Sequence, residues 1–192
     1  MKNALFALTL ALFAPLAAAE DALPAHPQIK VETSKGNFTL ELVTAQAPET
    51  VAHFVELVDR GFYDGLIFHR VIDGFMIQAG GYTSDFKERE DDTALQNESR
   101  NALSNRRSTI AMARPSDPHS ANSQFYINVA DNQRLDPQAS RGRWGYTVFG
   151  YVLDGMDVVD AIATAETAPQ GNFPNAPVET VVIEKMTRIA GD

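Results

Sequence analysis

The chain contains no cysteine among its 192 residues. It therefore forms no disulfide and has no thiol nucleophile, no cysteine-based zinc site and no dithiol redox chemistry. The fold must be held together by packing alone. With 44% hydrophobic residues the chain is able to build one sizeable core, which argues against a natively disordered protein.

The chain has fewer basic than acidic residues. The chain has 16 Lys and Arg against 25 Asp and Glu, which gives a formal net charge of -9. Proteins that bind nucleic acid neutralise its phosphates with lysine and arginine. We therefore expect no nucleic-acid partner.

The apolar run from Ala4 to Leu16 is too short to span a bilayer, which takes ~20 residues, and it contains Pro15. Lys2 precedes the run and three alanines at 17–19 follow it, which is the pattern of a secretory signal peptide. A membrane anchor is the alternative interpretation. We predict a cleaved signal peptide at residues 1–19, a linker at 20–27, and no membrane association after cleavage.

The N-terminal part of the remaining chain predicts a β-hairpin followed by a helix. Apolar and polar residues alternate on both sides of the turn-forming segment 34–37. Pro48 suits the first turn of a helix, and apolar residues then recur at helical spacing until Gly61. A second helix is predicted after Asp154, with Asp154 as its cap.

Most of the other periodic segments predict short strands. They lie at 66–80, where Asp73-Gly74 breaks the segment in two, and at 108–113, 123–129, 146–152 and 178–189. Short strands without βαβ alternation favour an antiparallel barrel capped by helices. We see no internal repeat and no further domain boundary.

An acid-rich stretch lies between residues 82 and 107. A calcium-binding loop would place its acids at alternating positions with a glycine for the turn, and this stretch does neither. We interpret it as a solvated loop. The acids concerned are Asp85, Glu88, Glu90, Asp91 and Asp92.

Three segments carry a specific resemblance to a known family. They are residues 68–81 (FHRVIDGFMIQAGG), 123–128 (SQFYIN) and 146–150 (YTVFG). In this order and spacing they resemble the cyclophilin-type peptidyl-prolyl cis/trans isomerases, and the similarity extends over residues 28–189. The exported character and the missing disulfides look like the bacterial periplasmic branch, which implies a periplasmic location.

The resemblance implies a fold and a set of site residues. The implied fold is mainly β, a closed eight-stranded antiparallel β-barrel capped by two α-helices, with a proline-binding groove on its outer wall. No metal and no cofactor are implied. The implied roles are catalysis for Arg70, the proline pocket for Phe75, Met76, Ala113, Tyr126 and Leu135, contacts to the substrate backbone for Gln78 and Gln124, and the groove rim for Tyr146.

An arginine suits this chemistry. Rotation about a peptide bond must break amide resonance, at a barrier of about 18 to 20 kcal/mol. In the twisted state the prolyl nitrogen regains a lone pair, so a fixed guanidinium is able to donate a hydrogen bond to it. Arg70 is always charged and its planar fork can be held in place, which favours it over a lysine.

The residue pattern by itself leaves other interpretations open. Arg70 could equally form a surface ion pair, because Asp73 is close in sequence. The apolar residues assigned to the pocket could be ordinary barrel core. Strand alternation does place Met76 and Gln78 on one face, and likewise Gln124 and Tyr126.

Three positions depart from the family pattern. Arg134 stands where many cyclophilins have a tryptophan that helps to bind cyclosporin, so we expect weak cyclosporin binding with retained activity. Tyr146 replaces a common histidine, and Tyr126 replaces a common phenylalanine and adds a hydroxyl to the pocket floor. We expect these two changes to alter substrate preference.

Other activities find less support. A serine hydrolase would need a nucleophile motif such as G-x-S-x-G, which is absent. His26, His53, His69 and His119 show no zinc-ligand spacing, so we interpret them as satisfied or solvent-exposed side chains. A chaperone that merely holds proline-containing segments is the serious alternative. The expected partners are proline-containing unfolded or partly folded exported polypeptides, and the expected state is a monomer.

Overall fold

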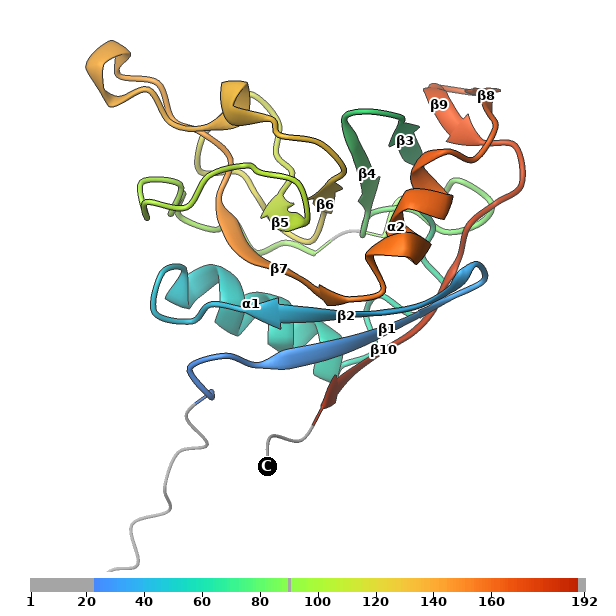
Figure 1. Ribbon diagram of the computed structural model, residues 1–192, viewed down its shortest axis with the longest axis horizontal. Coiled ribbons are helices and arrows are strands. Elements are labelled where there is room, and N and C mark those ends of the chain that lie inside the picture. The colour runs from blue at the N-terminus through green and yellow to red at the C-terminus, as the bar shows by residue number, and fades with distance from the viewer. Residues whose placement is uncertain (1–22, 90, 190–192) are drawn as a thin grey trace, which may run out of the picture.

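The computed structural model describes residues 23–89 and 91–189 (Figure 1). The predicted signal peptide at 1–19 and the first residues of the predicted linker lie outside the described residues. The described residues form ten strands, two α-helices and two short 3₁₀ helices, η1 (Gln133–Leu135) and η2 (Ala139–Arg141). None of the described helices is long and apolar enough to cross a membrane.

Eight of the strands form one antiparallel sheet in the order β10-β1-β2-β7-β5-β6-β4-β3 (Figure 1). This confirms the mainly β, eight-stranded antiparallel fold that the resemblance implies. The strands of this sheet are β1 (Gln28–Thr33), β2 (Gly36–Leu42), β3 (Arg70–Ile72), β4 (Met76–Ala79), β5 (Thr109–Met112), β6 (Phe125–Asn128), β7 (Val148–Asp154) and β10 (Ile183–Ile189).

The sheet curls until its two edges meet. The edge strands β3 and β10 do not pair along their length, but the residues just before β3 do reach the other edge. Phe68 N–H donates to the carbonyl of Val181 at 3.0 Å, and Ile183 N–H donates to the carbonyl of Leu66 at 2.7 Å. The barrel therefore closes through a short bridge ahead of β3 and not through a full strand ladder.

The first helix, α1 (Pro48–Asp59), closes one side of the barrel core. The apolar residues at helical spacing are buried in the main hydrophobic cluster, namely Val51, Phe54, Val55 and Val58, and Leu57 joins them. The Phe54 ring packs against Phe125 and Phe149, with centroid distances of 5.6 and 5.1 Å. Full burial of such a ring stabilises the fold by roughly 1.5–3 kcal/mol relative to leaving it exposed.

The start of α1 is held by a residue distant in sequence. No side chain of the helix caps it. Instead the Glu98 carboxylate accepts hydrogen bonds from the N–H groups of Glu49 and Thr50, at 3.2 and 2.9 Å. A negative charge at this end also interacts favourably with the helix dipole.

The second helix, α2 (Met156–Ala163), starts differently from the prediction. Asp154 does not cap it, because this residue is the last of β7 and pairs with Thr39 of β2. The cap position belongs to Gly155, at φ +80°. A β-carbon there would lie 2.7 Å from the carbonyl of Asn37, so only glycine fits.

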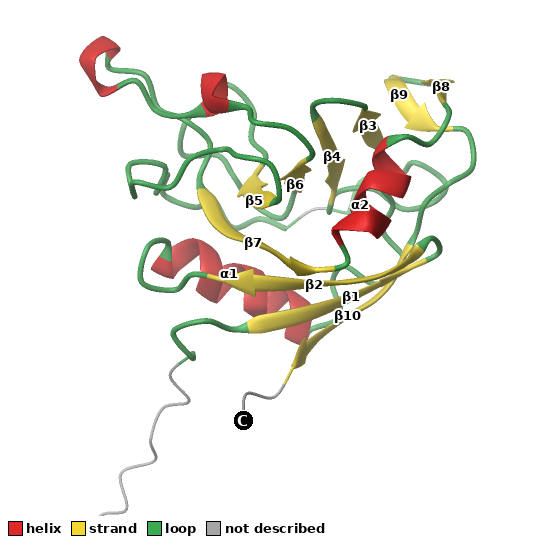
Figure 2. Cartoon of the chain, viewed as in Figure 1, coloured by secondary structure: helices red, strands yellow, loops and turns green. Residues whose placement is uncertain are grey.

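The sequence did not predict the hairpin of β8 (Thr167–Gln170) and β9 (Phe173–Pro177), which stands apart from the main sheet (Figure 2). Three of its residues are prolines, which weaken a strand pattern because they donate no ladder hydrogen bond. Its Phe173 ring packs on Tyr82 at 4.7 Å. The hairpin thereby covers the region beside β3.

Alternation along the strands separates two apolar clusters. Ile77, Phe125 and Ile127 face the main core inside the barrel. Their strand neighbours Met76 and Tyr126 face outward and belong to a second, smaller cluster. The other buried members of this outer cluster are Ala111, Ala113 and Val148, and the partly buried residues packed on it are Ile72, Phe75, Leu103, Leu135 and Tyr146.

Candidate active site

A cleft of about 320 Å³ lies over the outer cluster. It brings together all the site residues named from the sequence except Gln124, and it adds one that was not named, Arg114. Its lining residues are Arg70, Phe75, Met76, Gln78, Ala113, Arg114, Tyr126, Leu135 and Tyr146.

The register of three strands sets the centre of the cleft. Arg70 of β3 pairs with Gln78 of β4, and Gln78 pairs in turn with Tyr126 of β6. Residues directly opposite one another in an antiparallel pair project to the same face of the sheet. The three side chains therefore form a row across the outer wall of the barrel.

Hydrogen bonds hold the polar end of this row. Arg70 Nη1 donates to Gln78 Oε1 at 3.2 Å, and Gln78 Nε2 donates to Gln124 Oε1 at 3.0 Å. The ion pairs found among the described residues do not include Arg70, so an ion pair with Asp73 is not formed. The guanidinium is thus fixed in orientation while its charge stays available.

Gln124 lies in an adjoining hollow of about 210 Å³. The two hollows share Gln78, Ala113 and Arg114, so the cleft continues past the proposed catalytic arginine. The other residues that line the second hollow are Pro115, Asn122 and Gln124.

The apolar end of the cleft is built by side chains from three segments. Phe75 is held in the turn between β3 and β4, where its carbonyl accepts the N–H of Val129 at 3.1 Å and the Asn132 amide at 2.7 Å. The Tyr126 and Tyr146 rings meet edge to face, with centroids 5.9 Å apart. This gives a fixed apolar wall beside a charged group.

The Tyr126 hydroxyl is buried beneath the pocket. It donates to Asn105 Oδ1 at 2.6 Å. Burial raises the pKa of Tyr126 well above its usual value, and the neighbouring Tyr146 and Asp136 raise it further. The hydroxyl expected on the pocket floor is therefore already engaged with the protein.

Asn105 and Asp136 form a polar support that the sequence did not point to. The Asp136 carboxylate accepts from the backbone N–H and the side-chain amide of Asn105, at 2.7 and 2.8 Å, and from the Ser104 hydroxyl at 2.5 Å. Asp136 directly follows Leu135, so these bonds hold the loop that carries the pocket leucine. Both residues come from loops without periodicity, where no local signal marks them.

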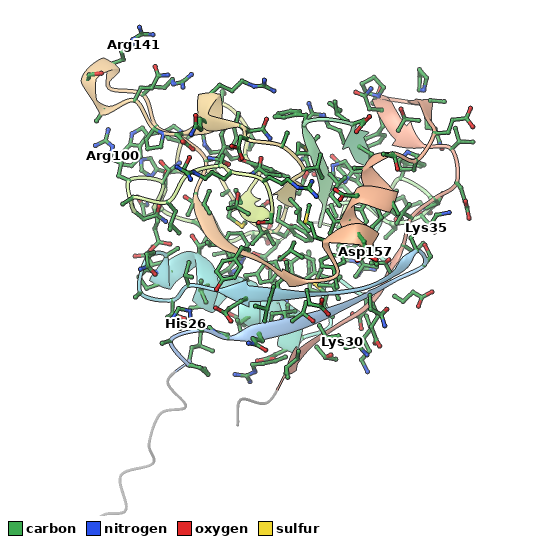
Figure 3. All side chains as sticks on the ribbon, in the orientation of Figure 1. His26, Lys30, Lys35, Arg100, Arg141 and Asp157 are labelled. Carbon is green, nitrogen blue, oxygen red and sulfur yellow. The ribbon has the colours of Figure 1, made fainter. Side chains whose placement is uncertain are left out.

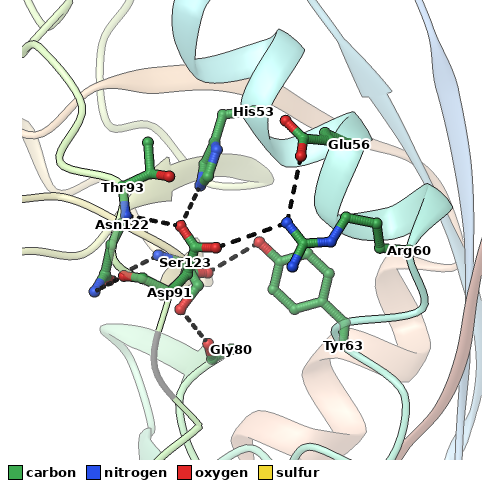
Figure 4. A network of polar contacts seen from close by, with 9 residues as sticks. All are labelled: His53, Glu56, Arg60, Tyr63, Gly80, Asp91, Thr93, Asn122 and Ser123. Atoms are coloured by element: carbon green, nitrogen blue, oxygen red, sulfur yellow. Dashed lines mark hydrogen bonds and ion pairs between the residues drawn. The ribbon is translucent and has the colours of Figure 1, made fainter.

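A second polar network includes Ser123, which directly precedes Gln124 in the chain (Figure 4). Tyr63 donates to the carbonyl of Ser123 at 3.0 Å, and the Ser123 hydroxyl donates to the carbonyl of Gly80 at 2.9 Å. Both bonds are buried. They fix the backbone that presents Gln124 to the second hollow.

Asp91 belongs to the same network. The acid-rich stretch predicts a solvated loop, and Asp91 corrects this expectation because its side chain is only 9% exposed. Its carboxylate lies 3.3 Å from His53 Nε2 and accepts the N–H of Thr93 at 3.1 Å, and its backbone carbonyl accepts from Asn122 (Figure 4). Glu90, from the same acidic stretch, lies outside the described residues.

Gly81 leaves room for the Gln124 side chain. A β-carbon on Gly81 would lie 2.6 Å from Gln124 Cδ, which is closer than non-bonded atoms approach. The second glycine of the GlyGly pair in the first motif is therefore needed for the position of a site residue.

Arg114 is the lining residue that the sequence did not predict. Its guanidinium carbon lies 4.6 Å from the centre of the Tyr146 ring. Nη1 donates to the carbonyl of Pro115 at 2.9 Å, and Nη2 donates to that of Gly145 at 3.2 Å. Arg114 follows β5 and lies outside the three motifs. No pattern in the sequence therefore distinguishes it from a surface arginine.

Arg134 borders the apolar end of the cleft. Its guanidinium carbon lies 4.5 Å over the centre of the Phe75 ring, a cation–π arrangement. The side chain itself is exposed. A cation thus covers one face of a ring that lines the pocket.

His69 differs from the expectation of a satisfied or exposed histidine. It is 3% exposed, and its Nδ1 has no hydrogen-bond partner among the described residues. The ring packs against Tyr82 at 4.8 Å and Phe173 at 5.7 Å. Burial, together with the nearby positive charge of Arg70, lowers the pKa of His69 to about 4.

Comparison with known families gives a match over nearly all of the described chain. Residues 28–188 match the model of the family described as cyclophilin type peptidyl-prolyl cis-trans isomerase/CLD. A peptidyl-prolyl cis-trans isomerase of Streptomyces antibioticus is 48% identical over 157 residues, covering 81% of this chain and 95% of the relative. Peptidyl-prolyl cis-trans isomerase A of Dickeya dadantii is 45% identical over 177 residues, covering 92% of this chain and 90% of the relative.

Solved structures show the same fold. A cyclophilin type peptidyl-prolyl cis-trans isomerase of Cryptosporidium parvum aligns with a TM-score of 0.71 at 22% identity, covering 87% of this chain and 99% of that one. Another crystal structure of that protein, obtained in the presence of the dipeptide Ala-Pro, aligns with a TM-score of 0.70 at 24% identity, covering 85% and 99%.

Proposed function

This chain belongs to the family of cyclophilin-type peptidyl-prolyl cis-trans isomerases, and we propose that Arg70 and the cleft beside it form its catalytic site. The chain is accordingly an enzyme that speeds rotation about X-Pro bonds. The observation that carries the proposal is a fixed guanidinium, without an ion-pair partner among the described residues, at the edge of an apolar cleft.

Arg70 acts by preferring the twisted amide. A planar amide nitrogen has almost no lone pair to accept a hydrogen bond, whereas the twisted prolyl nitrogen does. One of the five guanidinium donors is engaged with Gln78, so others remain to reach this nitrogen and the neighbouring carbonyl. Because the group is already oriented, little reorganisation is needed during the reaction.

The apolar wall holds the proline ring while the preceding residue turns. Phe75, Met76, Tyr126 and Leu135 supply this wall, and an apolar cleft with a few placed polar groups is the usual form of such a site. Gln78 and Gln124 are positioned to bond the backbone of the substrate. The Ala-Pro dipeptide used with the Cryptosporidium relative supports a proline-containing ligand for this cleft.

The effect expected of Arg70 is large. Acceleration from tens of seconds to milliseconds takes ~10⁴-fold, or about 5 to 6 kcal/mol. Loss of one preorganised electrostatic contact costs ~10²–10³-fold. We therefore expect Arg70→Ala to lower kcat/KM by that factor in exchange NMR of a short X-Pro peptide. Arg141→Ala is the matched control, because Arg141 lies on neither hollow.

The same variants separate an enzyme from a holding chaperone. If Arg70→Ala abolishes both isomerisation and the rescue of an aggregating client, catalysis is the function. If rescue persists at full strength without isomerisation, the protein holds proline segments and the turnover is incidental. Isomerisation at the wild-type rate in Arg70→Ala would overturn the assignment of the site.

We further propose that the enzyme works on exported polypeptides in the periplasm, as a monomer. Support comes from the basic, apolar and small-residue pattern at 1–19 and from the absence of cysteine. Mass spectrometry of protein from fractionated cells should give a mature N-terminus after Ala19 in the periplasmic fraction. A full-length protein in the cytosolic fraction would contradict export. Light scattering measures the mass in solution and tests whether the protein is a monomer.

Weak cyclosporin binding is the remaining proposal. Arg134 places a charge over Phe75 where many relatives place an indole, so an apolar drug loses a contact and must desolvate a cation. Calorimetry should show weak binding to the wild type and tighter binding to Arg134→Trp. A nanomolar dissociation constant for the wild type would contradict it.

A further inference from the structure

Arg114 occupies the wall between the two hollows. It lines the cleft that holds Arg70 and also the hollow that holds Gln124. The stacking on Tyr146 and the hydrogen bonds to Pro115 and Gly145 hold its guanidinium in one place. A group fixed in this way is preorganised to meet a substrate side chain.

The charge of Arg114 is not neutralised by the protein. Its hydrogen-bond partners are neutral backbone carbonyls, and no ion pair found among the described residues includes it. Its Nε is buried and has no partner within the described chain. Asp117, the acid on the neighbouring loop, accepts the N–H of His119 at 2.8 Å and lines neither hollow.

We propose, building on the function proposed above, that Arg114 makes the groove select segments with an acidic residue one or two positions before the proline. A carboxylate in the second hollow would meet a fixed, uncompensated cation. Because the terminal nitrogens of Arg114 already donate to backbone carbonyls, the attraction would be one of charge, which a partly buried site screens less than bulk water does. A lysine at the same substrate position would be repelled.

The substrate also needs a direction in the groove. In the proposed mode the prolyl nitrogen faces Arg70, and the residue before proline is bonded to that nitrogen. From Arg70 the hydrogen-bonded row runs through Gln78 to Gln124, which lies in the second hollow. We assign the residues that precede proline to this row, toward Arg114, and a preference at the position after proline would contradict that direction.

The wider charge distribution favours the same substrates. Residues 98–147 contain seven arginines and four acids, a formal charge of +3, in a chain whose total is -9. Arg70 and Arg114 line the cleft and Arg134 borders it. Arg100 and Arg141 both lie toward one end of the view in Figure 3, with Arg141 at the outer tip of its loop. Such a field attracts acidic segments and speeds their association.

The test uses purified full-length mature protein and matched proline peptides that carry Glu, Gln or Lys at one position. The positions are two before, one before and one after the proline. Exchange NMR gives the catalysed rate after subtraction of the spontaneous rate of each peptide. We expect kcat/KM to be about five- to tenfold higher for Glu than for Gln at one of the two preceding positions, and lowest for Lys there. The preference should shrink in 1 M salt.

Variants then assign the preference to Arg114. Arg114→Gln should remove the Glu-to-Gln ratio, and Arg114→Lys should retain part of it. Arg141→Gln changes the net charge equally but lies on neither hollow, so it removes only a distant, salt-screened charge and should lower the ratio far less than Arg114→Gln does. The Gln peptide serves as an internal reference in each variant, which corrects for any loss of folded protein.

The outcomes separate this inference from the function on which it rests. Equal rates for Glu and Gln peptides in the wild type, with catalysis of both, would overturn the selection while leaving the enzyme intact. A ratio that survives in Arg114→Gln would show that this arginine only ties the loops at 115 and 145 together. No catalysis of any peptide would contradict the assigned activity itself.

Discussion

Gln78 Oε1 accepts a hydrogen bond from Arg70 Nη1 at 3.2 Å, across a directly paired position of β3 and β4. The bond joins the group that would act on the prolyl nitrogen to the group that would hold the substrate backbone. The orientation of the arginine therefore depends on a neutral partner. A neutral partner fixes the guanidinium without reducing its charge.

The first prediction concerns this partner. Gln78→Leu should lower kcat about tenfold, because the guanidinium loses its orientation while the apolar pocket stays. Gln78→Glu should lower kcat further, because a carboxylate would pair with Arg70 and neutralise it. Exchange NMR with saturating peptide measures both. Higher activity for the Glu variant than for the Leu variant would contradict this role.

The second prediction compares two adjacent glycines. Gly81→Ala should displace the flexible Gln124 side chain and lower kcat/KM severalfold, with little loss of stability. Gly80→Ala should destabilise the fold by at least ~2 kcal/mol, because its φ is +91° and its β-carbon would lie 2.7 Å from the carbonyl of Ser123. Urea unfolding and peptide kinetics on both variants test the contrast. Equal losses of stability would speak against it.

The third prediction concerns the hydroxyl beneath the pocket. Tyr126→Phe should cost about 1 kcal/mol of unfolding free energy, because Asn105 loses a buried donor. Activity should stay within about twofold, since the ring face that meets the proline is unchanged. A tenfold loss of kcat/KM with unchanged stability would mean that the hydroxyl contacts the substrate.

The fourth prediction is a loss of stability in mild acid caused by His69. An unfolded chain protonates this residue near pH 6.5, whereas the folded chain resists protonation until about pH 4. The contribution of neutral His69 is complete above pH 6.5 and is lost as the pH falls toward 4, by about 3 kcal/mol in total.

Urea unfolding between pH 7.5 and 4 measures this slope. His69→Phe should flatten it, whereas Tyr82→Phe, which alters the ring packed on His69, should keep it. Identical slopes for the wild type and His69→Phe would assign the acid sensitivity to other groups.

Much of the fold was predictable because it depends on local periodicity. The helix α1 and the strands of the main sheet follow from alternation and from turn residues such as Asp73-Gly74. The hairpin β8–β9 was missed because its prolines weaken the strand pattern. The start of α2 was misassigned by one residue because the choice of Gly155 depends on the nearby carbonyl of Asn37, which is remote in sequence.

The candidate site, like the fold, was predicted only in the parts that depend on local sequence. The site residues that the resemblance implies line one cleft and its adjoining hollow, and their roles stay predictions. Arg114, Asn105 and Asp136 were not identified. Each of them acts through contacts between loops far apart in the chain, and no spacing within the sequence reports such contacts.

The outer cluster shares no buried side chain with the main core of the barrel. Substitutions among the loop residues that cover it, such as Leu135 and Tyr146, leave the interior packing untouched. Peptide recognition is therefore able to change at these positions while the main core keeps its packing. A randomised library restricted to these covering positions should yield new peptide preferences on an unchanged scaffold.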